Sequence, residues 1–127
     1  MADIAIIKLD DSKKWNRWII GTPPDVPKNS QFYSEHIQVN HVKNPDRKKF
    51  FDKEKEHSHK SPIEEFYFVL EGSLEVEIED KVVIVKQREI LTVPPEKRHK
   101  IKGFSDEVEV LVFRVPISNN ETKTVFG

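Results

Sequence analysis

Three histidines and a pair of adjacent glutamates are the residues whose types and spacing indicate chemistry in this chain. His57 and His59 are two positions apart, Glu64 and Glu65 follow shortly after, and His99 lies further along. In an extended strand, residues i and i+2 point to the same face, so the two nearby imidazoles can reach one point. Imidazole nitrogens and a carboxylate oxygen form a ligand set for divalent transition metals. The sequence therefore predicts a metal site, and the residues alone leave open which glutamate points inward.

The segments that must position these residues have the period of β-strands. After Gly72, apolar residues at alternate positions face inward between outward glutamates, which is the pattern of a half-buried strand. The continuous apolar run 82–85 predicts a strand buried on both faces. Other segments with alternating, aromatic or β-branched residues predict further strands at residues 4–6, 15–20, 33–43, 90–93, 99–101 and 108–115.

The remaining segments give no convincing sign of a helix. No stretch of ten or more residues has a helical period, and the segment 44–56, dense in charges of both signs, is expected to form a solvated loop with a short strand. About ten short β segments separated by turn signals predict an all-β sandwich or barrel.

A proline-rich stretch divides the chain, although 127 residues is the length of one domain. We expect residues 1–30 to form an N-terminal strand arm and a loop within the same domain, residues 31–116 the barrel, and residues 117–127 a loosely held C-terminal tail. Trp15 and Trp18 lie on the arm, and they must be buried against the body of the same chain or against a partner.

Composition excludes several classes of function. The formal net charge of -1 favours neither nucleic acid nor an anionic membrane, and acids interrupt the bases near residue 48. The absence of cysteine excludes disulfides, thiolate metal sites and cysteine nucleophiles. The apolar runs are too short for a transmembrane helix, and the N-terminus lacks the pattern of a signal peptide. We therefore expect a cytoplasmic protein that binds neither nucleic acid nor membrane.

The segment from His57 to Gly72 resembles the first conserved motif of the cupin superfamily. That motif has two histidines separated by one residue, then a glutamate, six residues and a glycine. Glu65 has the six-residue spacing to Gly72, so the resemblance favours Glu65 over Glu64 as the ligand. The spacing from the histidines to Glu65 is longer than the family usually has, and the loop that carries Pro62 would absorb the extra length.

A second cupin motif matches in register around His99. Its proline and histidine are present as Pro94 and His99, whereas Arg88 and Glu96 replace two glycines and Gly103 replaces an asparagine. Glycine at such places serves turns that need a positive φ. We therefore expect the turns in this chain to be built differently.

The resemblance implies a jelly-roll barrel, binding one divalent metal ion through His57, His59, Glu65 and His99. Iron, manganese, nickel and zinc all suit imidazole, and four ligands leave two octahedral positions open. Such a site would take a small polar molecule, and the expected activity is that of an oxygenase, isomerase, epimerase or decarboxylase. The alternative is a non-catalytic, metal-dependent binding module for a sugar or organic acid.

Weaker candidates surround the predicted ligands. Gln38 and Asn40 belong to a polar strand face that either lines a pocket or is solvated, and Tyr67 and His36 are candidates for proton transfer. Small cupins are often dimers, and the tryptophan-bearing arm would suit docking across a sheet edge. A homodimer is therefore expected.

Overall fold

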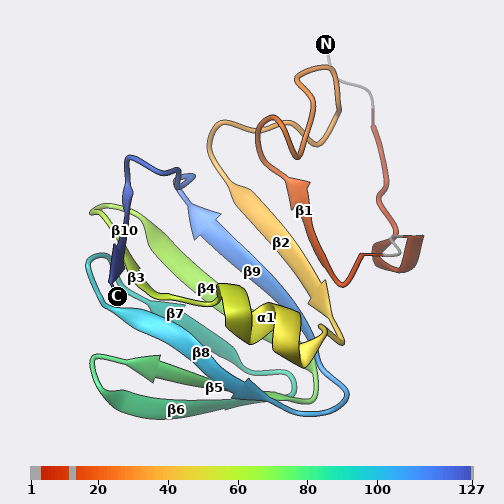
Figure 1. The fold of residues 1–127 in the computed structure, drawn as a ribbon. Coiled ribbons are helices and arrows are strands. Elements are labelled where there is room, and N and C mark those ends of the chain that lie inside the picture. The colour runs from red at the N-terminus through yellow and green to blue at the C-terminus, as the bar shows by residue number, and fades with distance from the viewer. Residues whose placement is uncertain (1–3, 12–13, 127) are drawn as a thin grey trace.

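Two five-stranded antiparallel sheets face each other in this computed structural model, which describes residues 4–11 and 14–126 (Figure 1). One sheet has the strand order β1-β2-β9-β4-β7 and the other β10-β3-β8-β5-β6. The prediction of an all-β sandwich or barrel is confirmed. The elements are η1 (Leu9–Asp11), β1 (Asn16–Ile20), β2 (Gln38–Lys43), α1 (Arg47–Lys53), β3 (Glu56–His59), β4 (Glu64–Glu71), β5 (Ser73–Ile78), β6 (Lys81–Lys86), β7 (Ile90–Val93), β8 (His99–Phe104), β9 (Glu109–Val115) and β10 (Lys123–Phe126).

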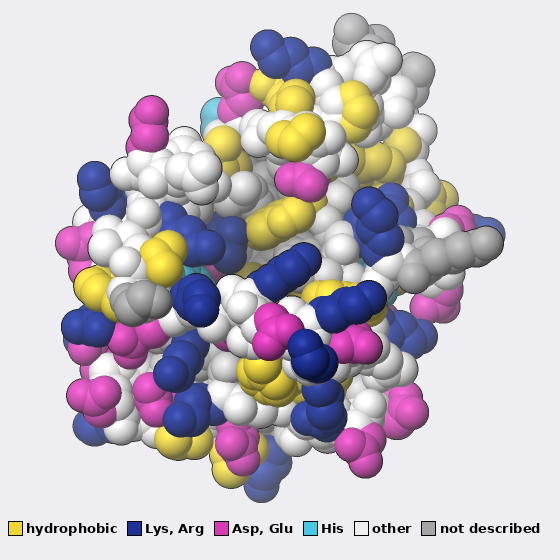
Figure 2. All heavy atoms as spheres, in the orientation of Figure 1, with side chains coloured by type: hydrophobic (Ala, Val, Ile, Leu, Met, Phe, Trp, Pro, Cys, Tyr) yellow, Lys and Arg dark blue, Asp and Glu magenta, His cyan; other side chains and the backbone are white. Residues whose placement is uncertain are grey.

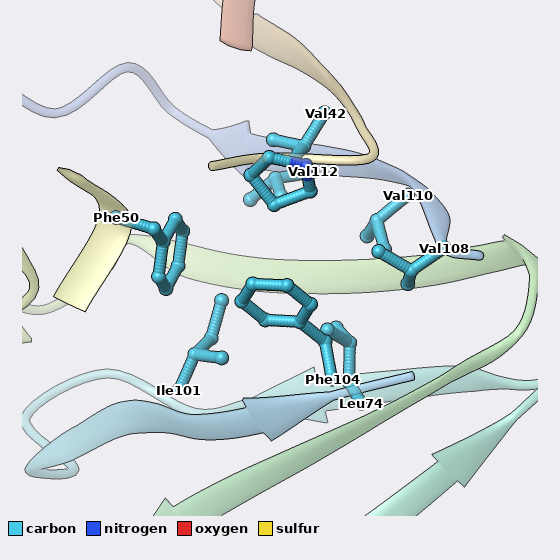
Figure 3. Close-up of a pocket in the computed structure, with 9 residues that line it drawn as sticks. Val42, Phe50, Leu74, Ile101, Phe104, Val108, Val110 and Val112 are labelled. Carbon is cyan, nitrogen blue, oxygen red and sulfur yellow. The ribbon is translucent and has the colours of Figure 1, made fainter. Parts of the chain in front are cut away.

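One end of the space between the sheets is a closed apolar core. The side chains that meet there come from both sheets and from α1, as Figure 3 shows, and they leave only about 20 Å³ between them. An apolar space of this size stays dry even where one water would fit. The lining residues are Val42, Pro45, Phe50, Leu74, Ile101, Phe104, Val108, Val110 and Val112.

The β5–β6 hairpin follows the predicted alternation. Leu74 and Val76 are buried while Glu75 is exposed, and the turn residues Glu79 and Asp80 both have positive φ. Two residues of positive φ suit the right-handed twist of a hairpin. The expectation of a β6 buried on both faces is wrong, because β6 is the edge strand of its sheet. Its residues Val82 and Ile84 are each 56% exposed.

The charged segment 44–56, expected to be a loop with a short strand, contains the helix α1 over residues 47–53. The Asp46 side chain caps α1 by accepting a hydrogen bond from the Lys49 backbone N–H at 2.9 Å. Phe50 is the buried residue of the helix, and its ring lies 5.3 Å from that of Phe104 and 6.3 Å from that of Trp15. Seven residues are too few to display a helical period, so a cap and one anchoring aromatic residue decide the conformation.

The two ends of the chain also differ from expectation. No strand forms around Ile4 and Ile6, whose side chains are exposed, and a short turn of 3-10 helix follows them. The arm does supply β1, which pairs with β2. At the other end, the tail that was expected to be loosely held contains β10, which pairs with β3 over four residues.

The strand predicted over residues 33–43 begins only at Gln38. The Ser34 hydroxyl accepts hydrogen bonds from the backbone N–H groups of His36 and Ile37, which holds this segment in a local turn. Neither α1 nor η1, the helices of the described residues, has the length and apolar character needed to span a membrane.

Candidate metal centre

Three strands bring the four predicted ligands together at the polar end of the barrel. His57 and His59 come from β3, His99 from β8 beside it, and Glu65 from β4 of the opposite sheet. His57 and His99 are direct register partners, so their side chains point to the same face. One donor atom from each of the four residues lies within 4.8 Å of the others, and none of the four is more than 5% exposed.

The choice between the two glutamates follows from strand parity. Glu65 is 1% exposed and points between the sheets, whereas Glu64 is exposed on the outer face of β4. Adjacent residues of a strand point to opposite faces, so only one of them can join the histidines. The structure places Glu65 in the group, as the spacing to Gly72 indicated.

Two of the imidazoles are oriented by backbone carbonyls. His57 Nδ1 lies 2.8 Å from the Lys55 carbonyl oxygen, and His99 Nδ1 lies 2.8 Å from that of Lys97. A carbonyl can only accept, so Nδ1 carries the hydrogen in both rings. In the neutral ring, Nε2 then presents a lone pair to the centre of the group, which is the state that a metal ligand needs.

The third imidazole is held by a side-chain relay. His59 Nδ1 lies 2.7 Å from the Ser118 hydroxyl, and the Ser118 backbone N–H donates to the Gln38 side-chain oxygen at 2.7 Å. All three rings therefore have Nδ1 against an oxygen and Nε2 directed inward. Partners of this kind orient histidine ligands, and the two backbone carbonyls also fix the tautomer of their rings.

Two buried nitrogen atoms have no hydrogen-bond partner among residues 4–11 and 14–126. They are the Nε2 atoms of His57 and His59, both directed into the group. His59 Nε2 lies 3.3 Å from a Glu65 oxygen, but this contact does not have the geometry of a hydrogen bond. Buried polar atoms are rarely left without a partner. Two orphaned imidazole nitrogens beside a buried carboxylate fit a divalent cation, so the residues present are compatible with the metal that the sequence predicts.

Glu65 is the electrostatic centre of the group. Its Oε1 accepts from the Tyr67 hydroxyl at 2.7 Å and lies 2.8 Å from His99 Nε2, and its Oε2 accepts from Arg114 Nε. Burial by itself raises the pKa of the Glu65 carboxyl, but the charge of Arg114 and the contacts with the imidazoles outweigh burial and hold this pKa well below its usual range. Glu65 is therefore an anion at neutral pH.

The pKa values of His57 and His99 shift in opposite directions. Burial, followed by the nearby charge of His99, lowers the pKa of His57 to about 3, so its ring stays neutral. Burial also opposes a charge on His99, but the hydrogen bond to Glu65 and its negative charge raise the pKa of His99 above its usual value. In the metal-free group, His99 therefore takes up a proton more readily than His57 does.

The weaker candidates of the sequence analysis occupy three different positions. Gln38 and Asn40 share the inner face with Glu65 and Tyr67, and Asn40 Oδ1 is buried without a partner. Tyr67 is buried, and burial together with the Glu65 charge raises its pKa well above the usual value. Its hydroxyl keeps its proton and donates a hydrogen bond to Glu65 at 2.7 Å, and a role in proton transfer stays a prediction. His36 is exposed on the loop before β2 and does not join the group.

Arg114, Ser118 and Lys123 contact or flank the group and were missed by the sequence analysis. Arg114 shares the inward face of β9 with Val110 and Val112, and a charge on the apolar face of a predicted strand is a signal that was available. Ser118 and Lys123 lie in the C-terminal segment, where no pattern marked them.

The turns around β7 do not follow the sequence expectation. The residues that replace the two motif glycines, Arg88 and Glu96, themselves adopt φ values of 69° and 70°. The left-handed conformation is therefore retained, at a cost of about 1 kcal/mol for each side chain. At Gly72, φ is 75° and an added Cβ would lie 2.1 Å from the Glu107 carbonyl oxygen, so this position requires glycine.

The family model for the cupin domain matches residues 52–115, which include all four ligand candidates and the strands that carry them. The chain belongs to the cupin family. The structural neighbours have the same fold, and at their low sequence identity the similarity establishes the fold alone.

Three proteins illustrate these similarities to the cupin. A protein from Planctomyces limnophilus is 16% identical, with a TM-score of 0.61 and coverage of 96% of both chains. Pac13 from Streptomyces, a nucleoside dehydratase, is 16% identical, with a TM-score of 0.57 over 73% of this chain and 70% of its own. The DMSP lyase DddQ from Ruegeria pomeroyi DSS-3 is 18% identical, with a TM-score of 0.59 over 94% of this chain and 58% of its own.

One curated relative is similar in sequence. It is the uncharacterized HTH-type transcriptional regulator YobQ from Bacillus subtilis (strain 168), which is 36% identical over 61 residues. The match covers 48% of this chain and 25% of the regulator, so the cupin spans about a quarter of the relative that it matches.

Proposed function

We propose that this cupin binds one divalent metal ion through His57, His59, Glu65 and His99 and uses it to act on a small polar molecule. The observation that carries the proposal is the common orientation of the imidazoles. Each Nδ1 is held by an oxygen, and two of the inward Nε2 atoms have no partner beside a buried carboxylate. Buried nitrogen atoms of a purely structural core are nearly always hydrogen-bonded, so the unpaired Nε2 atoms favour a bound cation.

When bound, the metal supplies Lewis acidity that polarises an oxygen of the substrate. The residues of the chain do the positioning. Tyr67 keeps its proton and orients the Glu65 carboxylate, while Arg114 balances the negative charge of that carboxylate. The barrel wall around the group excludes bulk water, which strengthens each of these electrostatic contacts.

Catalysis of the oxygenase, isomerase, epimerase or decarboxylase type is the first form of this proposal. Two neighbours that share the fold, Pac13 and DddQ, are named as enzymes, so this fold accommodates catalysis. A non-catalytic, metal-dependent binding module is the second form. The match to a transcriptional regulator favours it, since small-molecule binding by a cupin domain could serve a regulatory protein. A homodimer and a cytoplasmic location remain predictions.

Metal analysis tests the common part of both forms. Protein purified without chelator should contain about one divalent ion per chain. The same measurement on a His59→Ala variant should give a large loss of bound metal, and a His36→Ala variant, altered at an exposed histidine outside the group, should keep its metal. Full occupancy in His59→Ala would reject the site.

Ligand turnover separates the two forms. Small molecules that raise the melting temperature of the metal-loaded protein are bound by the native state. Incubation of such a molecule with the loaded protein under air, followed by mass analysis, should yield a changed product if the cupin is an enzyme. Quantitative recovery of the unchanged molecule would favour the binding module.

A further inference from the structure

Two cations at the polar end of the barrel have unused hydrogen-bond donors. Arg114 uses Nε for Glu65, but its two Nη groups make no hydrogen bond within the described residues. Lys123 is half-buried, and its side chain makes no hydrogen bond or ion pair with any described residue. Removing a cation from water without giving it a partner is unfavourable. These two side chains are therefore poised to gain a partner that the chain does not supply.

Both cations face the same space. Lys123 is the direct register partner of His59, and Arg114 is that of Glu65, so each lies on the inner face of its sheet beside a ligand candidate. Burial and the nearby charge of Arg114 lower the pKa of Lys123, which places the two cations within electrostatic reach of each other. An anion between them would remove this repulsion.

The carboxylates of the polar end are already engaged. Glu65 accepts from Tyr67 and Arg114, and the Glu54 carboxylate accepts from the Ile101 backbone N–H at 2.8 Å. Burial raises the pKa of Glu54, which favours its neutral form. Among the described residues, the donors left for an external anion at this end are thus the positively charged groups of Arg114 and Lys123. The unpaired Nε2 atoms and Asn40 Oδ1 are acceptors that suit a cation instead, and a divalent metal ion there would add to the positive charge.

An open groove of about 530 Å³ adjoins Arg114. It is lined by Lys14, Trp15, Asn16, Trp18 and Lys53, between the β1 edge and α1. Figure 2 shows dark-blue Lys and Arg side chains gathered around the hollow between α1 and the strands above it. The Trp18 ring joins the groove to the polar end, because the Arg114 guanidinium carbon lies 4.9 Å from its centroid. Two indoles give this groove apolar surface and two lysines give it positive charge.

We propose that the polar end of the barrel binds a small organic carboxylate, with its carboxylate on Arg114 and Lys123 and its apolar part against Trp18. The planar guanidinium matches a carboxylate in shape and hydrogen bonding. The inference deepens the proposed function, on which it rests for the identity of the site. The two cations and the groove are nevertheless present without the metal, so the two proposals can be tested separately.

Benzoate and benzamide are the matched probes, because they share a ring and differ in charge. Both are titrated into the full chain, once metal-loaded and once after chelator treatment, while the Trp18 indole N–H signal is followed by NMR. A charge-assisted hydrogen bond is stronger than a neutral one, so benzoate should bind at least about tenfold more tightly in both preparations. Equal affinity for the two probes would overturn the inference.

Lys123 provides the decisive variant, because Arg114→Gln would also disturb Glu65. Lys123→Met should weaken benzoate binding about tenfold and leave benzamide binding unchanged, and Lys123→Arg should restore most of the loss. Lys81→Met, at an exposed lysine of β6, is the matched control. Unchanged benzoate affinity in Lys123→Met would reject the role of this residue.

The remaining outcomes distinguish this inference from the proposed function. Zinc binding, measured by calorimetry on the same samples, reports on the metal site alone. Benzoate selectivity without zinc binding would reject the proposed function and retain the anion site. Zinc binding without benzoate selectivity would support the metal site and reject the anion site. Inorganic phosphate that binds more tightly than benzoate, with the same dependence on Lys123, would overturn the choice of a carboxylate.

Discussion

The two ends of one barrel interior differ in almost every physical property. At the apolar end, Leu74, Phe104 and Val110 leave only about 20 Å³ and bury no charge. At the polar end, strands of the same two sheets carry three histidines, a carboxylate and two cations into a buried space. Burial of apolar area stabilises the fold, whereas buried ionisable groups oppose it unless they are paired. The comparison indicates that the apolar end supplies most of the folding stability, while the polar end carries the groups that can bind and react.

Loss of a metal ligand should give the largest effect. The His59→Ala variant removes one of four donors, and we expect metal affinity to fall about a thousandfold, more than the loss usually seen for an outer-shell partner. Isothermal calorimetry with Zn²⁺ measures this change. The fold should remain intact in the metal-free state, because the apolar end is untouched. Unfolding of the variant, seen by circular dichroism, would show that the stability of the fold depends on the polar end as well.

A cavity at the apolar end should lower the stability of the fold and leave metal affinity nearly unchanged. Leu74 is 3% exposed, and Leu74→Ala should lower the free energy of unfolding by about 3 kcal/mol. Chemical denaturation measures this loss. Metal affinity should stay within about twofold, since no ligand candidate lies on β5. A large loss of metal affinity would show that the two ends are coupled.

The pH dependence of metal binding should reflect His99. The raised pKa of this ring stabilises the metal-free fold at pH values below about 6.5, and this contribution is lost as pH rises through the folded-state pKa. A metal must displace the same proton, so affinity should fall about tenfold per pH unit once pH drops below that raised value. His57, with a pKa of about 3, adds no competition at neutral pH. Calorimetry between pH 5 and pH 8.5, on the order of one unit per step, checks the slope. Affinity that is constant down to about pH 5 would contradict it.

Removal of an outer-shell partner should have a smaller effect. The Ser118→Ala variant frees His59 Nδ1 from its hydroxyl partner, and metal affinity should fall about tenfold. Ser61→Ala, at an exposed serine near the same strand, is the matched control and should bind metal normally. Competition with a chelating dye measures both variants. Equal affinity for the two would indicate that Ser118 does not orient the ring.

The smallest expected change is a gain in stability at the polar end. Glu96 has a φ of 70°, and Glu96→Gly should raise the free energy of unfolding by about 0.5–1 kcal/mol, because glycine adopts this conformation without steric cost. The Glu96 backbone N–H bonds to the His59 carbonyl oxygen at 2.7 Å, so metal affinity is a second readout and should not change. A destabilised variant would show that the side chain itself contributes to the fold.

The sequence by itself determined the strand alternation and the four ligand candidates. His57 and His59 share a face because of the two-residue period, which is a local property, and the resemblance to the cupin motifs implied Glu65 and His99 as their partners. The all-β class followed from the same periodicity. These features depend on neighbouring residues along the chain, so they can be predicted without the fold.

Only the tertiary structure decided which residues complete the site. Ser118, Arg114 and Lys123 meet the histidines through pairings between strands that are distant in sequence, and no local pattern encodes those pairings. The helix α1 depends on the packing of Phe50, and the exposure of β6 depends on its place at a sheet edge. The same local signals are compatible with a central or an edge strand, and with a loop or a capped helix. Long-range contacts choose between them.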